Sequence, residues 1–343
     1  MNQPTSVPGG RTPVLAVTMG EPAGVGGELT LMAWLRRRDA GPKFLAVDNA
    51  DRLKALAKTI GAKVPIAAIS DPAEAEKVFA DALPVLDIGL TAPVVTGKPD
   101  PASAPAVRAA IEKATALALE GRVAGVVTNP IQKATLYGAG FNYPGHTEYL
   151  ADLTKAPNPP VMMLACPGLR VIPVTIHVGL RAALDRLDTA LIVEQAELTW
   201  AALKRDFAIS SPRLAVAGLN PHAGEEGAMG DEEARIIRPA IEHLRAEGFQ
   251  VIGPEPPDTL FTERRRATYD AAICMYHDQA LIPIKTLDFT GGVNITLGLP
   301  IVRTSPDHGT ALDLAGTGQA DPSSLLGALD AAAAIARNRE AAA

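Results

Sequence analysis

Short apolar runs alternate with longer amphipathic stretches along most of this chain, and no other feature constrains its fold as much. The apolar runs predict strands at 14–19, 44–47, 125–128, 161–164, 170–175, 213–217 and 271–275. The stretches between them predict helices at 28–38, 51–60, 104–120, 189–206, 232–247 and 323–336. Alternation of this kind favours a largely parallel sheet that is covered by helices on both faces. The two strands at 161–164 and 170–175 are close enough in sequence to form an antiparallel pair.

The composition is that of a folded chain with a substantial core. Of its 343 residues, 47% are hydrophobic and 20% are charged, which is enough for two domains or one large domain. The net charge of -6 argues against a nucleic-acid surface or a polybasic membrane patch. An anionic substrate would therefore have to be bound by a few local basic residues.

Only two cysteines are present, Cys166 and Cys274, and both lie in apolar surroundings. This count excludes a disulfide framework and a cysteine-rich zinc site, and it predicts a reducing, cytoplasmic setting. Residues 1–13 lack the pattern of a signal peptide and are expected to be a frayed tail. No apolar run reaches the ~18–20 residues that a bilayer requires.

Three single histidines, His177, His222 and His277, each follow an apolar strand. Because the ends of parallel strands meet at one edge of a sheet, three imidazoles arriving there could form a three-nitrogen metal site. The alternative is a set of unrelated histidines that are hydrogen-bonded at turns. His243 belongs instead to a polar helical face and is expected to be solvated.

The segment G-H-T-E-Y at 145–149 predicts a helix start, with Gly145 freeing the backbone just before it. Helix N-termini bind anions, so His146 and Thr147 are candidate contacts to a phosphate or carboxylate. The alternative is that these side chains only cap the helix.

Further along, Lys285, Asn294 and Arg303 are lone polar residues inside apolar stretches. Lysine and arginine are seldom buried without a partner, so two such cations and an amide could bind an anion. The alternative is that ordinary salt bridges occupy the cations, with Asp278, Asp288 or Asp307 as partners.

Several long motifs occur together in this chain and in one order: G-E-P-A-G-V-G-G-E, T-N-P-I-x-K, P-G-H-T-E, L-N-P-H-A-G-E, M-Y-H-D-Q, G-V-N-I-T-L-G-L-P and R-T-S-x-D-H-G-T-A. From about residue 14 to 330 the chain resembles the 4-hydroxythreonine-4-phosphate dehydrogenase family of vitamin B6 biosynthesis. The resemblance implies an isocitrate/isopropylmalate dehydrogenase-like α/β fold, with two α/β/α domains flanking a cleft. No linker separates two halves, so we expect interwoven domains. Residues 1–140 plus 305–343 would form a cofactor-side domain, and 141–304 a domain for metal, substrate and dimerisation.

The resemblance also implies roles for individual residues. The metal ligands would be His177, His222 and His277, one of them contributed across the interface of a homodimer. The substrate contacts would be His146, Thr147, Lys285, Asn294 and Arg303. The segment 307–322 is similar to the adenosine-binding segment of the wider superfamily, which implies nicotinamide cofactor contacts at His308, Gly309, Thr310 and Asp313. No G-x-G-x-x-G occurs, so a Rossmann fingerprint does not support the cofactor.

One departure from the family's pattern is Gly27, where G-I-G-P-E usually has proline. Its loss removes a residue well suited to the helix start, with no catalytic group involved.

By resemblance, the reaction is oxidation of 4-phosphonooxy-L-threonine with NAD or NADP to a 3-keto acid. Loss of CO2 from that acid leaves 3-amino-2-oxopropyl phosphate. A divalent ion, Zn2+, Mg2+, Mn2+ or Co2+, would polarise the substrate oxygen. Lys285 is the first candidate for the general base, and Asp278 is either the second or a residue that orients an imidazole.

Three alternatives remain open. One is a paralogous dehydrogenase acting on D-threonate or D-erythronate 4-phosphate. Another is a metal-dependent hydrolase or lyase without nicotinamide, and the third is an acyltransferase of related fold such as phosphotransacetylase.

Overall fold

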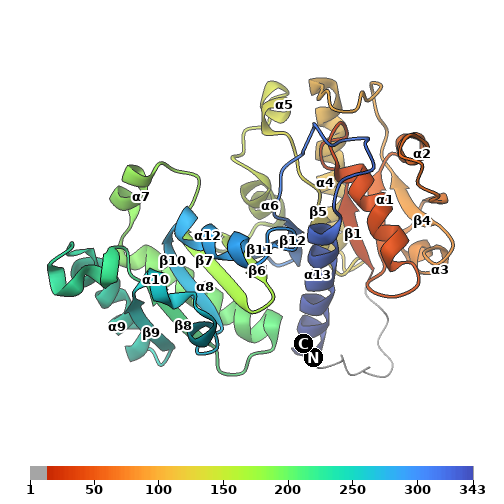
Figure 1. The fold of residues 1–343 in the computed structure, drawn as a ribbon. Helices are drawn as coiled ribbons and strands as arrows, with labels where there is room; N and C mark the ends of the chain where they lie inside the picture. The colour runs from red at the N-terminus through yellow and green to blue at the C-terminus, as the bar shows by residue number, and fades with distance from the viewer. Residues whose placement is uncertain (1–13, 343) are drawn as a thin grey trace.

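The computed structural model describes residues 14–342, so the frayed tail expected at 1–13 lies outside the described residues. Two α/β lobes stand side by side in Figure 1, the first drawn mainly in red to yellow and the second in green to blue. Within the described residues a single twelve-stranded sheet runs through both lobes, in the order β3-β4-β2-β1-β5-β12-β11-β6-β7-β10-β8-β9. The predicted α/β class is thereby confirmed.

The strands are short and mostly buried. In the first lobe they are β1 (Leu15–Thr18), β2 (Phe44–Asp48), β3 (Ile66–Ile69), β4 (Leu83–Asp87) and β5 (Val126–Thr128). In the second lobe they are β6 (Val161–Cys166), β7 (Leu169–Thr175), β8 (Arg213–Ala217), β9 (Gln250–Glu255) and β10 (Ala271–Tyr276). The strands at the seam are β11 (Val293–Leu297) and β12 (Arg303–Pro306).

Both wings of the sheet are parallel, and only its centre is antiparallel. The antiparallel pairs are β12 with β11, β11 with β6, and β6 with β7. The last of these, with Leu164 opposite Val171, confirms the antiparallel pair expected at 161–175. The seam between the lobes is therefore made of continuous backbone hydrogen bonds.

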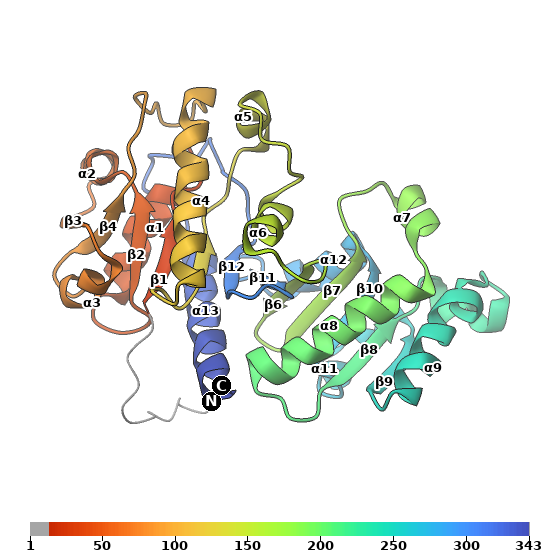
Figure 2. The ribbon, with the colours of Figure 1, turned by 180° about the vertical axis from the view of Figure 1, so that it is seen from behind.

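The helices cover both faces of this sheet, and Figure 2 shows α4 and α8 lying across the strands of their respective lobes. The longer helices are α1 (Gly26–Arg37), α2 (Ala50–Thr59), α4 (Ala104–Leu119), α6 (His146–Thr154), α8 (Thr189–Phe207), α9 (Arg238–Ala246), α12 (His277–Leu287) and α13 (Ser323–Ala342). The shorter ones are α3 (Ala75–Val78), α5 (Lys133–Gly138), α7 (Leu180–Arg186), α10 (Pro257–Leu260) and α11 (Glu263–Arg266). The helix expected at 232–247 begins with a π-helical turn, Glu233–Ile237, before α9.

Local chemistry explains where several helices start. Asn49 and Asp188 cap α2 and α8 by accepting hydrogen bonds from the amides of Arg52 and Leu191. The last helix, α13, packs along the seam, where its Ala328 carbonyl accepts a hydrogen bond from Thr304 of β12. No described helix is long and apolar enough to cross a membrane.

Candidate active site

The three strands that precede the sequence-predicted histidines lie next to one another. β10 pairs in parallel with β7 on one side and with β8 on the other, so their carboxyl ends share one edge of the sheet. Open α/β sheets build their binding sites at this edge. The predicted convergence of the histidine-bearing strands is therefore confirmed.

His177 and His277 face one another across this edge, with ring centroids 6.0 Å apart. They line a pocket of about 270 Å³ together with Thr175, Tyr276 and residues of α7. Burial, the positive charge of Lys133 and the neighbouring His277 lower the pKa of His177, which favours the neutral imidazole that binds metals. His277 Nδ1 lies 2.7 Å from Asp278 Oδ1, so this carboxylate orients the ring.

His222 does not join this pair. It starts a loop, His222–Glu226, in which every residue has a left-handed backbone, including four that are not glycine. Within residues 14–342, no group of three His, Cys, Asp or Glu side chains is close enough to hold one ion. The three-histidine site therefore stays a prediction, with two of its members adjacent in this structure.

Arg303 is a buried cation at the start of β12, and only 4% of it is exposed. Its guanidinium donates hydrogen bonds to the hydroxyls of Thr296 (2.8 Å) and Thr128 (2.7 Å), while Nε has no partner in the described part of the chain. Burial lowers the pKa of Arg303 to about 10. No carboxylate of residues 14–342 lies within ion-pair distance of it, and the charge of Glu148 only partly opposes the effect of burial. Such a group is a strong candidate for binding an anion.

His146 and Thr147 begin α6, as predicted. The Nε2 of His146 is buried and has no hydrogen-bond partner among the described residues. Burial and the charges of Arg303 and Lys133 hold the pKa of His146 well below its usual range. The helix has no side-chain cap, and Thr147 is half-buried. The capping alternative is therefore not realised, and the open imidazole nitrogen fits an anion contact better.

Lys133 and Glu148 act electrostatically on the predicted residues, and the sequence did not single them out. The Lys133 charge lowers the pKa of both His146 and His177, and the Glu148 charge opposes the shift at His177. A Cβ added to Gly145 would lie 3.4 Å from Glu148 Oε2 and 3.8 Å from Lys133 Nζ. These two charges therefore couple the histidine pair to the Arg303 end of the site. The signal was present in the sequence, because Lys133 ends the T-N-P-I-x-K motif.

Asn294 and Lys285 lie on β11 and α12. Asn294 Oδ1 is buried without a partner in the described chain, so this amide is available to a ligand. Lys285 Nζ lies 2.6 Å from Asp307 Oδ2 and donates a hydrogen bond to the Asp307 carbonyl at 2.9 Å. The salt-bridge alternative thus holds for Lys285, with Asp307 as partner, and it fails for Arg303.

The segment 307–322 runs beside the first lobe. Its backbone is held by the buried Glu28, whose carboxylate accepts hydrogen bonds from the amides of Gly316 and Ala320. The Val25 amide donates to the Thr310 carbonyl at 3.0 Å. A pocket of about 220 Å³ lies here, lined by Val25, Leu29, Phe289, Thr290, Asp307, His308, Ala311, Leu314, Ala320, Asp321 and Ser324. Of the expected cofactor contacts, His308 lines this pocket, whereas Gly309, Thr310 and Asp313 are outside its lining.

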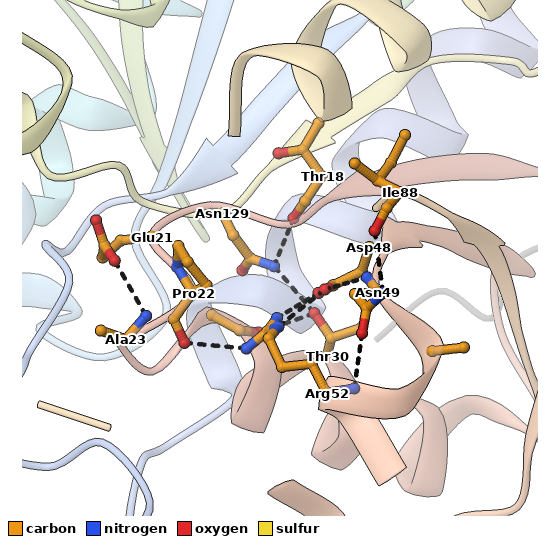
Figure 3. A network of polar contacts seen from close by, with 12 residues as sticks. Thr18, Glu21, Pro22, Ala23, Thr30, Asp48, Asn49, Arg52, Ile88 and Asn129 are labelled. Carbon is orange, nitrogen blue, oxygen red and sulfur yellow. Dashed lines mark hydrogen bonds and ion pairs between the residues drawn. The ribbon is translucent and has the colours of Figure 1, made fainter. Parts of the chain in front are cut away.

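A polar network lies at the loop 19–25, between β1 and α1, and is shown in Figure 3. The Arg52 guanidinium binds the buried Asp48 carboxylate through Nε and Nη2, and it donates to the Pro22 carbonyl through Nη1. A Cβ on Gly27 would lie 2.9 Å from this guanidinium. Gly27, which stands where the family usually has proline, therefore leaves room for Arg52. The sequence pattern did not predict this packing role.

Comparison with known sequences identifies close relatives. The family described as "Pyridoxal phosphate biosynthetic protein PdxA" matches residues 42–332. A 4-hydroxythreonine-4-phosphate dehydrogenase of Caulobacter vibrioides is 54% identical over 330 residues, 95% of this chain and 98% of the relative. One of Bradyrhizobium diazoefficiens is 52% identical over 335 residues, 94% of this chain and 96% of the relative.

Solved structures agree. A 4-hydroxythreonine-4-phosphate dehydrogenase from Klebsiella pneumoniae superposes with a TM-score of 0.85 at 41% identity, covering 94% of this chain and 99% of that one. A terephthalate 1,2-cis-dihydrodiol dehydrogenase from Burkholderia xenovorans gives a TM-score of 0.63 at 27% identity, covering 94% and 98%. A branched-chain phosphotransacylase from Enterococcus faecalis shares only the fold, at 12% identity and a TM-score of 0.54.

The family match spans most of the chain, and relatives above 50% identity cover nearly all of it. The chain is an enzyme that belongs to the PdxA family of pyridoxal phosphate biosynthetic proteins.

Proposed function

We propose that this chain is a 4-hydroxythreonine-4-phosphate dehydrogenase. It would oxidise 4-phosphonooxy-L-threonine with NAD or NADP to a 3-keto acid, which then loses CO2 to give 3-amino-2-oxopropyl phosphate. The observation that carries this proposal is the buried Arg303, which has no direct ion-pair partner among residues 14–342, with the unpartnered His146 Nε2 as its electrostatic neighbour. A buried guanidinium without a direct carboxylate partner suits a substrate that brings its own anion.

The anionic groups of the substrate would bind at this end of the site. Arg303 supplies a fixed donor fork, because two threonine hydroxyls already orient it. His146 and Thr147 would add contacts from the N-terminus of α6, where the helix dipole also favours negative charge. Asn294 would contribute its amide. Phosphate and carboxylate share this chemistry, and both are present in the proposed substrate.

A divalent ion would be held by His177, His277 and His222. The donor set fits, because the first two imidazoles face each other and the pKa of His177 is lowered, which favours its neutral form. When bound, the ion would supply a Lewis acid for the C3 oxygen, and the nicotinamide would accept the hydride. Zn2+, Mg2+, Mn2+ and Co2+ all remain within the proposal.

A homodimer is part of the proposal, with a second copy contributing one of the three histidines. Support comes from α7, which borders the histidine pocket and exposes Leu180 by 59% and Leu184 by 42%. Apolar side chains exposed together are common where a second chain packs. The separation of His222 from the other two histidines also fits a site completed by another copy.

Two chain residues are proposed to handle protons and orientation at the reacting carbon. Lys285 would take the C3-hydroxyl proton, and its position is fixed by the carbonyl and carboxylate of Asp307. Asp278 is the alternative base, although its hydrogen bond to His277 fits an orienting role better. The two assignments differ in outcome: Asp278→Asn would mainly weaken ion binding, whereas Lys285→Met would lower kcat with the ion still bound.

The cofactor is proposed to bind along 307–322. His308 lines the 220 Å³ pocket there, and Gly309, Thr310 and Asp313 are proposed to contact the cofactor from the same segment. Residues 1–140 plus 305–343 would then act as the cofactor-side domain, and 141–304 as the domain for metal, substrate and dimerisation. A cytoplasmic location also remains a prediction.

One assay tests this function. Purified chain, a divalent ion and NAD+ or NADP+ are mixed with 4-phosphonooxy-L-threonine, and absorbance of the reduced nicotinamide is followed. Signal with this substrate is expected. Signal only with D-threonate or D-erythronate 4-phosphate would move the assignment to a paralogous dehydrogenase. No reduction with any of the three would overturn the proposal in favour of a reaction without nicotinamide.

A further inference from the structure

The three histidine-bearing strands are tied together by a buried chain of hydrogen bonds at their carboxyl ends. Backbone pairing between β10 and β8 runs from Ala271 opposite Leu214 to Ile273 opposite Val216. Beyond Ile273, β10 is no longer paired with β8, while it stays paired with β7 as far as Tyr276 opposite Thr175. A split therefore opens between β10 and β8 just before the residues that carry His277 and His222.

The side chain of Gln279 bridges this split. Its Oε1 accepts a hydrogen bond from the Met275 amide of β10 at 2.6 Å, and its Nε2 donates to the Gly218 carbonyl beyond β8 at 2.7 Å. Only 6% of Gln279 is exposed. It occupies the first turn of α12, two residues after His277, and helical side chains point back toward the N-terminus of their helix. One amide thus satisfies two backbone groups that the diverging strands leave unpaired.

The third strand is joined to the same point. Thr175, the last residue of β7, donates its hydroxyl to the Met275 carbonyl at 2.8 Å. The amide and the carbonyl of Met275 are therefore bonded to Gln279 and Thr175, respectively. A continuous path, Thr175 to Met275 to Gln279 to Gly218, crosses β7, β10 and β8 in order.

The path continues into the loop that bears His222. The buried Glu233 accepts hydrogen bonds at 2.7 Å from the amides of both Leu219 and Asn220. Gly218 is packed so closely that an added Cβ would lie 2.9 Å from Ala223. The backbone leading to His222 is thus fixed by Gln279 on one side and Glu233 on the other.

We propose that Gln279 is a positioning residue, which fixes the strand ends of each copy from which His177, His222 and His277 are presented, whichever copy supplies the third ligand to an ion. The inference rests on the proposed function, because it assigns Gln279 to the ion-binding geometry of that site. Gln279 would contact neither the ion nor the substrate. Its effect would be exerted through the backbone of Met275 and Gly218.

The test measures ion affinity directly, without any assay of turnover. Full-length chain is stripped of metal, and Zn2+ is titrated in competition with a chromophoric chelator. Gln279→Met keeps the size of the side chain and removes both hydrogen bonds, so Zn2+ should bind at least about tenfold more weakly than to wild type. Thr175→Val should weaken binding in the same direction and Thr175→Ser, which keeps the hydroxyl, should restore it.

Two controls separate positioning from general stability. Ile241 lies on α9 and is 1% exposed. Ile241→Ala should open a cavity and lower the melting temperature. It should nevertheless leave the Zn2+ affinity unchanged. His177→Ala defines the affinity that depends on the histidines. Wild-type affinity in Gln279→Met, with a melting temperature lowered as in Ile241→Ala, would overturn the inference alone. Wild-type chain that binds Zn2+ no better than His177→Ala would overturn the proposed function itself, and the inference with it.

Discussion

Arg52 and Arg303 are two arginines whose side chains are largely shielded from solvent, and the contrast between them separates a charge with an ion-pair partner from one proposed to bind a substrate. The side chain of Arg52 is 7% exposed and forms a two-pronged pair with Asp48, with its remaining nitrogen on the Pro22 carbonyl. Arg303 as a whole residue is 4% exposed; among residues 14–342 its side chain has two hydroxyl partners, and its buried Nε has none. The exposed fraction therefore does not distinguish these two arginines, and the difference between them lies in their partners.

The largest effect is expected when Arg303 is replaced by methionine. Truncating a buried charge that binds an oppositely charged group typically costs about 2–5 kcal/mol, so kcat/KM for 4-phosphonooxy-L-threonine should fall at least about 30-fold. The melting temperature should stay the same or rise, because a buried cation without a direct ion-pair partner is removed. Steady-state kinetics and thermal unfolding measure the two quantities. Arg303→Lys serves as control, restoring charge without the donor fork. Full activity in Arg303→Met would remove the contrast between the two arginines.

The opposite pattern is expected at Arg52. Arg52→Met leaves the Asp48 carboxylate buried without its partner, and breaking a buried pair in this way costs about 3–5 kcal/mol of unfolding free energy. Denaturant titration would measure this loss. The double variant Asp48→Asn with Arg52→Met should recover part of it, because the uncompensated charge is gone. An Arg52→Met chain as stable as wild type would show that the pair of Arg52 and Asp48 does not stabilise the loop 19–25.

The acid side of the stability profile should report on the burial of His146 and on the charges of Arg303 and Lys133 that act on it. The pKa of His146 is lowered in the folded state, so below about pH 6.5 the unfolded chain binds a proton that the folded chain refuses. Stability should therefore fall as pH drops below that value, by at most about 1.4 kcal/mol per pH unit from this residue.

Unfolding titrations of wild type and His146→Gln between pH 7 and 5 would reveal this slope, which the variant should lack. Arg303→Met should reduce the slope as well, because one of the charges that lowers the pKa of His146 is removed. Equal slopes in wild type and His146→Gln would refute the assignment.

The smallest effect is expected at Gly27. Gly27→Ala places a methyl group 2.9 Å from the Arg52 guanidinium, and overpacking of this kind costs about 1–3 kcal/mol. In an Arg52→Met background the same substitution should cost less, since the shorter, uncharged side chain can yield. Denaturant unfolding of the four chains forms a double-mutant cycle. Additive losses would mean that Gly27 and Arg52 do not interact.

The sequence alone predicted the strands that consist mainly of apolar residues. Val216 and Ile273 belong to strands that were predicted to within a residue. By contrast, no strand was predicted at β12, because R-T-S-P is polar or turn-forming in every letter. It is buried nonetheless, since Thr304 bonds the Ala328 carbonyl and Arg303 bonds two threonines. Satisfied polar groups are invisible to a pattern of hydrophobic residues.

The candidate site divides in the same way. Position after a strand was enough to nominate His177 and His277, and a helix-start pattern was enough for His146. Sequence could not determine that Asp307 pairs with Lys285 rather than with Arg303, because that choice depends on side-chain directions at the seam. It also gave no reason to single out Gln279, whose two partners are backbone groups of different strands.

The continuous sheet has a consequence for any attempt to study the lobes as separate proteins. A cut between the two strands, at residues 298–302, would part β11 from β12 and leave Val293, Ile295 and Leu297 on an unprotected edge strand. The fragment 14–140 would likewise expose β5, whose Val126 and Val127 now pair with β12. Bare apolar edges invite strand addition by other chains, so such fragments should aggregate. The chain has two lobes in shape, but each lobe needs the other to protect the edge strands that a cut would expose.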